Sequence, residues 1–175
     1  MALPEKLKRF RPDTLTIILI AVIIYIWFRP PAWVKDFNSP APTFAVSLLD
    51  GREVTLESLK GKVVLVSFWA TWCPYCRHEM PSMDEFYQDY RNKGFEILAL
   101  SIDDEPDKVQ AFMKETGYHF PVGMSDPLIS QAFGGVSQVP MSFVIDTEGR
   151  IRHKVTGQVH YARLESLVGP LLPKN

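Results

Sequence analysis

Cys73 and Cys76 are the residues of this sequence whose types and spacing most directly indicate chemistry. They are the only cysteines of the chain, and three residues separate them from the apolar run at residues 63–69. Two sulfurs at this spacing can close a short disulfide or open into a pair of thiols. At the start of a helix, the macrodipole and the unpaired N–H groups stabilise a thiolate, the form that attacks another disulfide. The spacing therefore predicts thiol–disulfide exchange.

The two cysteines are expected to have different roles, because the predicted helix begins within the motif. Cys73 would lie at the exposed N-terminus of the helix and act as the nucleophile that forms a mixed disulfide. Cys76 would lie one turn deeper and resolve that mixed disulfide. Pro74 and Tyr75 stand between them and are expected to tune the redox potential, and proline suits the first helical turn. We expect no cofactor beyond the redox-active disulfide itself.

Zinc binding, an inert structural disulfide and a metal-chaperone role are the alternatives to thiol–disulfide exchange for this cysteine pair. Zinc would need two more ligands, and the histidines lack a paired spacing. The histidines are His78, His119, His153 and His160. An inert structural disulfide across so short a loop would constrain little unfolded-chain entropy. A metal-binding chaperone that uses the cysteines stays open as an alternative from a different class, and no metal ligand is assigned.

The uncharged, almost wholly apolar run at residues 14–28 predicts a transmembrane signal-anchor. As a helix it would extend about 22 Å, somewhat less than the roughly 30 Å hydrocarbon core. Four basic residues precede it, so the positive-inside rule places residues 1–13 in the cytoplasm and the remaining chain outside. We therefore expect a single-pass protein of the bacterial cytoplasmic membrane with its catalytic domain on the periplasmic side. A cleaved signal peptide is the alternative.

Residues 29–42 contain four prolines and are predicted to be an extended linker to a single domain at residues 43–175. The first 42 residues hold six of the 19 Lys and Arg and three of the 20 Asp and Glu. The other 133 residues therefore carry a net charge of −4. This charge argues against a nucleic-acid partner.

Strand and helix patterns alternate through the domain. Asp50-Gly51 predicts a hairpin, and residues 63–69 and 95–102 are typical of strands buried on both faces. A helix is expected from the cysteine motif to about residue 92, with a kink at Pro81. The other predicted elements are helices at residues 104–116, 127–133 and 161–172 and a hairpin of strands at 141–146 and 150–155. Together they predict an α/β domain with a mixed central sheet flanked by helices.

Particular residues give the chain a resemblance to a known family. The segment 68–76, Pro81 and the Val139-Pro140 pair before a strand resemble the thioredoxin fold. Segments elsewhere are similar to the membrane-anchored TlpA/ResA-type thiol-disulfide oxidoreductases, which have an AhpC/TSA–redoxin type domain. These segments are residues 41–44, 59–62, 77–81 and 143–151. The resemblance covers residues 41–172, including an N-terminal hairpin and a family-type insertion before Pro140.

The resemblance implies a protein-disulfide reductase, often serving cytochrome c maturation or particular client proteins. Its partners would be disulfide-containing clients and a membrane electron donor of the thiol-transfer type. The segment 137–141 departs from that of the dedicated cytochrome-maturation branch, so the client stays open. A thiol oxidase or isomerase of exported proteins is the alternative. A peroxiredoxin is disfavoured, because Val66 and Ala70 replace the Pro and Thr that its motif needs.

The resemblance also gives roles to residues outside the cysteine pair. Pro140 is expected to follow a cis peptide bond, with the backbone of Val139 facing the sulfurs and pairing with a substrate strand. Trp72 and Tyr75 are candidates to contact substrate, whereas Trp69 is expected in the core.

Glu79 is the candidate proton acceptor for Cys76, which precedes it by three residues. Spacing alone leaves open an ordinary solvated glutamate, and the match to a glutamate of the family favours the functional role. Thioredoxins carry a buried Asp and a Lys in two adjacent strands, and this sequence has Ser67 and Ala99 in their places. Their absence makes Glu79 the nearest replacement.

Overall fold

The computed structural model describes residues 16–22 and 34–173. The chain divides into two compact units, residues 1–32 and 33–175. In the first unit, residues 16–22 form a helix inside the predicted membrane segment. The rest of that segment, the predicted tail at residues 1–13 and the beginning of the predicted linker lie outside the described residues. Within the described ranges, no helix is both long and apolar enough to cross a membrane.

The second unit is built around strand β4 (Val63–Trp69), in which all seven residues are buried. It lies between β5 (Phe95–Ser101), which runs parallel to it, and β7 (Met141–Ile145), which runs antiparallel. The sheet has the order β1-β8-β7-β4-β5-β6. Its other strands are β1 (Val34–Pro40), β6 (Val122–Met124) and β8 (Arg150–Thr156). The continuous apolar runs thus form central strands of a mixed sheet, as predicted.

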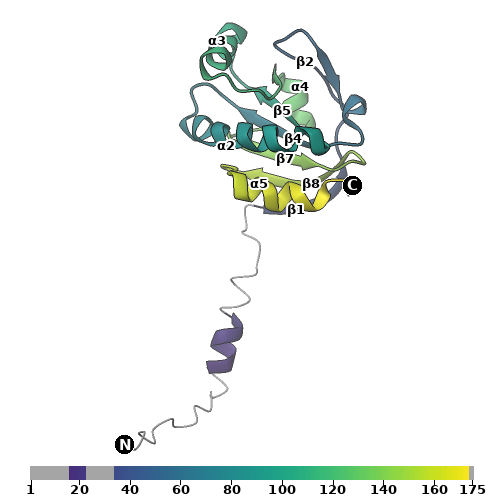
Figure 1. Ribbon diagram of the computed structural model, residues 1–175, viewed down its shortest axis with the longest axis vertical. Coiled ribbons are helices and arrows are strands. Elements are labelled where there is room, and N and C mark those ends of the chain that lie inside the picture. The colour runs from purple at the N-terminus through teal and green to yellow at the C-terminus, as the bar shows by residue number, and fades with distance from the viewer. Residues whose placement is uncertain (1–15, 23–33, 174–175) are drawn as a thin grey trace, which may run out of the picture. The chain divides into compact units, whose positions relative to one another are not determined.

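Helices cover both faces of the sheet, and each face has its own apolar core. Figure 1 shows α2 (Pro74–Tyr90) and α5 (Tyr161–Val168) side by side on one face. Helix α3 (Pro106–Thr116) packs on the same face through Val109 and Phe112. The opposite face is covered by helix α4, the short helix η1 and a hairpin of two strands. These elements are α4 (Pro127–Ala132), η1 (Glu57–Leu59), β2 (Ala45–Ser47) and β3 (Glu53–Thr55).

Helix α2 positions the cysteine pair, and both of its ends follow from local residue types. Cys73 is its N-cap and Pro74 its first residue, where proline costs no hydrogen bond. The helix passes through Pro81 and is followed by η2 (Arg91–Lys93). Gly94 then adopts φ 86°, the left-handed conformation that commonly ends a helix. The predicted extent of this helix is therefore confirmed to within a few residues.

Residues 34–40 differ from the prediction, because they form an edge strand rather than part of a linker. Strand β1 pairs antiparallel with β8 from Val34–Val155 to Pro40–Arg150, with an irregularity between Asp36 and Ser39. An edge strand pairs on one side only and tolerates proline. The prolines therefore did not exclude pairing, and the globular unit begins several residues earlier than expected. The last helix is also shorter than the predicted range 161–172, because α5 ends at Val168 and the short helix η3 (Gly169–Leu171) follows.

Candidate active site

The two cysteines form a disulfide at the N-terminus of α2, with their Cα atoms 5.3 Å apart. The Cys73 sulfur is the N-cap acceptor of the helix, because the backbone N–H of Cys76 donates to it at 3.2 Å. An N–H group directed at this sulfur, together with the helix dipole, stabilises negative charge on it after reduction. The local geometry therefore favours a Cys73 thiolate.

Both cysteines are buried, and Cys73 is more enclosed than the sequence predicted. Cys76 is fully buried, as expected for the deeper sulfur, but Cys73 is only 3% exposed. The expectation of an exposed Cys73 is therefore wrong. Trp72 and Tyr75 beside it are 67% and 65% exposed. These two aromatic side chains are therefore available at the surface beside the disulfide.

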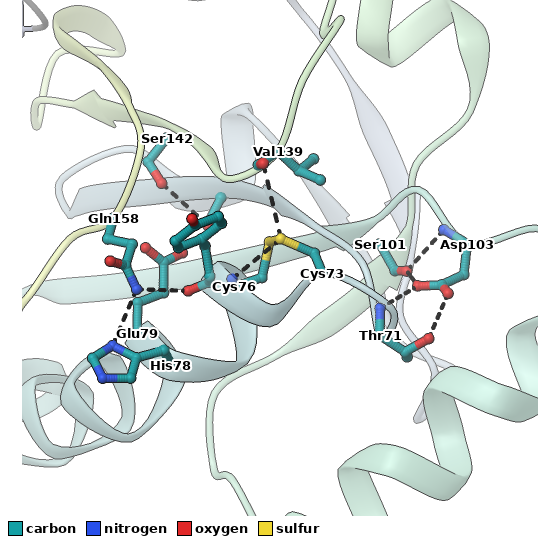
Figure 2. Close-up of a disulfide and its surroundings, with 12 residues drawn as sticks. Thr71, Cys73, Cys76, His78, Glu79, Ser101, Asp103, Val139, Ser142 and Gln158 are labelled. Carbon is teal, nitrogen blue, oxygen red and sulfur yellow. Dashed lines mark hydrogen bonds between the residues drawn. A yellow bond between two sulfur atoms is a disulfide. The ribbon is translucent and has the colours of Figure 1, made fainter.

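The loop before β7 brings a proline against the disulfide. The Val139-Pro140 peptide bond is cis, as the resemblance implied, and the Val139 carbonyl oxygen lies 3.8 Å from the Cys73 sulfur (Figure 2). A groove of about 410 Å³ runs beside this contact. It is lined by Tyr75, Gln138, Val139, Pro140, Thr156, Gly157 and Gln158. A client segment can therefore lie next to the reactive sulfur.

Glu79 is a buried carboxyl on the helical turn that follows Cys76, and only 1% of it is exposed. Residues three apart on a helix are neighbours on its surface, so Glu79 and Cys76 share one side of α2. The backbone N–H of Val159 donates to the Glu79 carboxylate at 2.8 Å. Burial raises the pKa of Glu79 to about 8, against the opposing effects of the Val159 N–H and the Arg163 charge. At neutral pH the carboxyl is mostly protonated.

The strand register agrees with the expected replacement of the thioredoxin acid and lysine. Ser67 on β4 is opposite Ala99 on β5 and opposite Ser142 on β7. The Ser142 hydroxyl donates to the Ser67 hydroxyl at 3.1 Å, and both serines are buried. Neutral residues thus occupy both positions, and the hydrogen-bond partner of Ser67 comes from β7 rather than from β5.

Comparison with known proteins identifies the family. The Redoxin family matches residues 37–167 of this chain. The chain belongs to the redoxin family. The thiol-disulfide oxidoreductase ResA of a Bacillus cereus strain is 38% identical over 166 residues, covering 94% of this chain and 96% of the relative. ResA of Bacillus subtilis (strain 168) is 30% identical over 173 residues, covering 97% and 96%.

Solved structures agree with this assignment. A thiol:disulfide interchange protein of the thioredoxin family from Chlorobium tepidum TLS superposes with a TM-score of 0.72 at 33% identity, covering 78% of this chain and 98% of that one. The thioredoxin domain of a thiol-disulfide oxidoreductase from Bacteroides vulgatus has a TM-score of 0.66 at 26% identity, covering 77% and 99%. This redoxin therefore has the predicted thioredoxin-like fold, and it is a thiol-disulfide oxidoreductase.

The structure places every residue singled out from the sequence. Trp69 is buried in the core of the redoxin domain, as expected. Pro74 and Tyr75 form the first turn of α2, and Trp72 precedes it. For the zinc alternative, the described part of the chain contains no group of three or more His, Cys, Asp or Glu side chains arranged around a metal site.

A buried carboxylate that the sequence analysis did not single out holds the loop before Cys73. Asp103 accepts from the Thr71 backbone N–H at 2.8 Å, from the Thr71 hydroxyl at 2.6 Å and from the Ser101 hydroxyl at 2.6 Å (Figure 2). Asp103 lies two residues beyond the end of the parallel strand β5, and polar residues at the carboxyl ends of such strands often meet at a site. That position was the available signal.

Replacement of Asp103 by alanine is expected to lower the free energy of unfolding by about 2–4 kcal/mol, because it leaves the buried Ser101 hydroxyl and two half-buried donors of Thr71 without their acceptor. Chemical denaturation of the oxidised protein measures this. Asp104→Ala is the matched control, since Asp104 is the exposed neighbour. Equal stabilities of the two variants would contradict the structural role of the Asp103 network.

Gln158, His78 and His160 also lie at the site without having been predicted for it. The Gln158 amide nitrogen is 3.0 Å from the Tyr75 carbonyl oxygen and 3.1 Å from Nδ1 of His78. The rings of His78 and His160 pack edge to face, 5.8 Å apart. Gln158 lies just after strand β8, about 80 residues beyond the cysteine motif. No sequence motif connects a glutamine at this distance with the cysteines. No sequence signal for its position existed.

Proposed function

We propose that this redoxin is a membrane-tethered reductase that transfers two electrons from Cys73 and Cys76 to disulfides of client proteins outside the cytoplasm. The observation that carries the proposal is the Cys73 sulfur at the N-cap of α2, which accepts the Cys76 N–H beside the cis bond at Pro140. A sulfur in this position is suited to attack a disulfide as a thiolate. The reducing direction is supported by the resemblance to TlpA/ResA-type proteins.

The exchange proceeds in two steps, formation of a mixed disulfide with the client and its resolution. The Cys73 thiolate attacks one client sulfur, and the other client sulfur leaves as a thiolate that takes a proton from water. Cys76 then loses its proton and attacks Cys73. This closes the Cys73–Cys76 disulfide and releases the second client thiolate. The client gains two electrons, the enzyme loses two, and we propose no cofactor beyond the cysteines.

In this proposal the ionised fraction of Glu79, which grows as the pH rises toward the pKa of this carboxyl, accepts the Cys76 proton and returns it when the enzyme is reduced again. Burial raises its pKa to about 8, near the ordinary value of about 8.5 for a free thiol, so its carboxylate is a stronger base toward thiols than an ordinary glutamate. The buried position of Glu79 on the Cys76 side of α2 supports this role.

Client binding is assigned to the groove along Val139 and Pro140, which the exposed Tyr75 also lines. The exposed Trp72, next to Cys73 in the chain, is a second proposed client contact. The Val139 carbonyl oxygen lies 3.8 Å from the Cys73 sulfur, and an extended client segment is proposed to pair with this stretch of backbone. Disulfide-bearing exported proteins are the proposed clients, and cytochrome c maturation is one process that such a reductase serves.

The membrane tether is assigned to residues 14–28, with residues 1–13 in the cytoplasm and residues 43–175 on the periplasmic side. The apolar run and the basic residues before it support this topology. A membrane dithiol donor must then re-reduce the Cys73–Cys76 disulfide.

Fractionation of cells that express the full chain tests the tether. The expected result is a membrane-bound protein of full length whose catalytic domain is digested by protease added outside the cytoplasmic membrane. A soluble exported protein that lacks residues 1–28 would show a cleaved signal peptide instead, and protection from protease would overturn the topology.

The direction of exchange is tested by two reactions of the same purified chain. Reduced enzyme is mixed with a peptide that contains a disulfide, and oxidised enzyme with the same peptide as a dithiol. The expected result is net reduction of the disulfide peptide. Preferential oxidation of the dithiol peptide would make the protein a thiol oxidase.

A further inference from the structure

Residues 157–160, between β8 and α5, contact both the first turn of α2 and the cis-proline loop. The Gly157 N–H donates to the Pro140 carbonyl at 2.9 Å. The amide nitrogen of Gln158 donates to the Tyr75 carbonyl at 3.0 Å, and the Val159 N–H donates to Glu79. Gln158 is therefore held directly against the peptide that links the two cysteines.

The acceptor of the Gln158 amide belongs to a peptide group that also contacts the reactive sulfur. The Tyr75 carbonyl and the Cys76 N–H are the two ends of one peptide unit. Its oxygen accepts from Gln158, and its N–H donates to the Cys73 sulfur at 3.2 Å (Figure 2). The three groups thus form a chain of two consecutive hydrogen bonds that ends on Cys73.

The orientation of the Gln158 amide follows from its partners. A carbonyl oxygen can only accept, so the group facing Tyr75 is the amide NH₂. The same nitrogen lies 3.1 Å from Nδ1 of His78, which accepts from the amide in the tautomer that carries its proton on Nε2. The ring of His160 packs edge to face against that of His78. The two hydrogens of the amide are therefore directed to the Tyr75 carbonyl and the His78 ring.

We propose that Gln158 is a redox-tuning residue that stabilises the Cys73 thiolate through the Tyr75–Cys76 peptide group. A donor on the carbonyl polarises the peptide and strengthens the hydrogen bond made by its N–H, by about 10–30% per bond in such chains. The effect is larger for a thiolate than for a neutral sulfur, because hydrogen bonds to ions are the stronger ones. The inference rests on the exchange chemistry alone and holds in whichever direction electrons flow.

Gln158→Met tests the proposal, because methionine has a similar length and no donor. The pH dependence of Cys73 alkylation by iodoacetamide is measured on the reduced full chain in detergent. Its midpoint is expected to rise by about 0.3–0.6 pH unit, a two- to fourfold loss of thiolate stabilisation. At a pH above that midpoint, the reduction potential should become more negative by about 10–20 mV, since a tenfold change corresponds to 29.6 mV.

Gln138→Met is the matched control. Gln138 lines the same groove from the cis-proline loop, and among the described residues it makes no hydrogen bond to α2. Its alkylation midpoint should not move. Gln158→Asn, whose amide is one methylene too short to reach Tyr75, should reproduce the shift of Gln158→Met. An unchanged midpoint in both Gln158 variants, or equal shifts at positions 138 and 158, would overturn the proposal.

Discussion

Cys76→Ser is expected to trap this enzyme on its clients as a mixed disulfide through Cys73. The variant keeps the thiolate at the N-cap of α2 but lacks the sulfur that resolves the intermediate. Turnover of a disulfide substrate should fall on the order of 10³-fold or more, because the residues of a covalent mechanism act as a unit. Non-reducing gel electrophoresis and mass spectrometry of the trapped species identify the attached cysteine and the client.

Cys73→Ser is the comparison that assigns the roles. It should neither turn over substrate nor accumulate a mixed disulfide, because the remaining thiol, Cys76, is fully buried and a client sulfur cannot reach it. If Cys73→Ser traps clients as efficiently as Cys76→Ser does, the assignment of nucleophile and resolving cysteine is wrong.

Glu79→Gln is expected to remove a large pH dependence of stability. The pKa of Glu79 is raised by burial from 4.5 to about 8, so the folded chain keeps a proton that the unfolded chain releases. Stability contributed by the protonated carboxyl is complete below about pH 4.5 and falls by up to about 1.4 kcal/mol per pH unit toward pH 8. Above pH 8 the loss is constant, at about 4–5 kcal/mol in total.

Denaturation of wild type and Glu79→Gln between pH 5 and pH 9 measures this difference. The uncharged amide retains an acceptor for the Val159 N–H, so the variant should become more stable than wild type as the pH rises. Glu85→Gln, at an exposed position of the same helix, is the control and should follow wild type. Parallel stability curves for wild type and Glu79→Gln would show that the carboxyl is not protonated in the folded state at neutral pH.

The same substitution should slow the resolution of the mixed disulfide. Loss of a positioned proton acceptor costs about 10²-fold or more in rate, and the mixed disulfide should live correspondingly longer. Rapid mixing of reduced enzyme with a fluorescent disulfide peptide resolves the two steps. An unchanged pH–rate profile for the second step would exclude Glu79 as the proton acceptor of Cys76.

The parts of the fold that the sequence predicted well are those with strong local signals. The continuous apolar run of β4 and the CxxC motif after it define the centre of the sheet and the start of α2. The hairpin turn at Asp50-Gly51 forms as its residue types require, with φ 84° at the glycine. The cis bond before Pro140 came from the family resemblance, because a proline alone carries little information about its isomer.

The features that were missed depend on contacts between distant segments. Strand β1 has no apolar alternation to mark it, and it forms because β8 offers a free edge. The enclosure of Cys73 depends on the Val139 loop, which is 66 residues further along the chain. Asp103 and Gln158 contact the site across separations of 32 and 83 residues along the chain. Local residue patterns do not contain this information.

The equilibrium reduction potential of the Cys73–Cys76 pair tests the central claim most directly. The full chain, purified in detergent, is equilibrated in dithiothreitol and glutathione buffers of known potential, and the fraction of disulfide is quantified by alkylation. A value below about −220 mV, toward the value of about −270 mV for thioredoxin, is the result expected of a reductase. A value near about −120 mV, that of a dedicated oxidant, would contradict the account and make this redoxin a donor of disulfides.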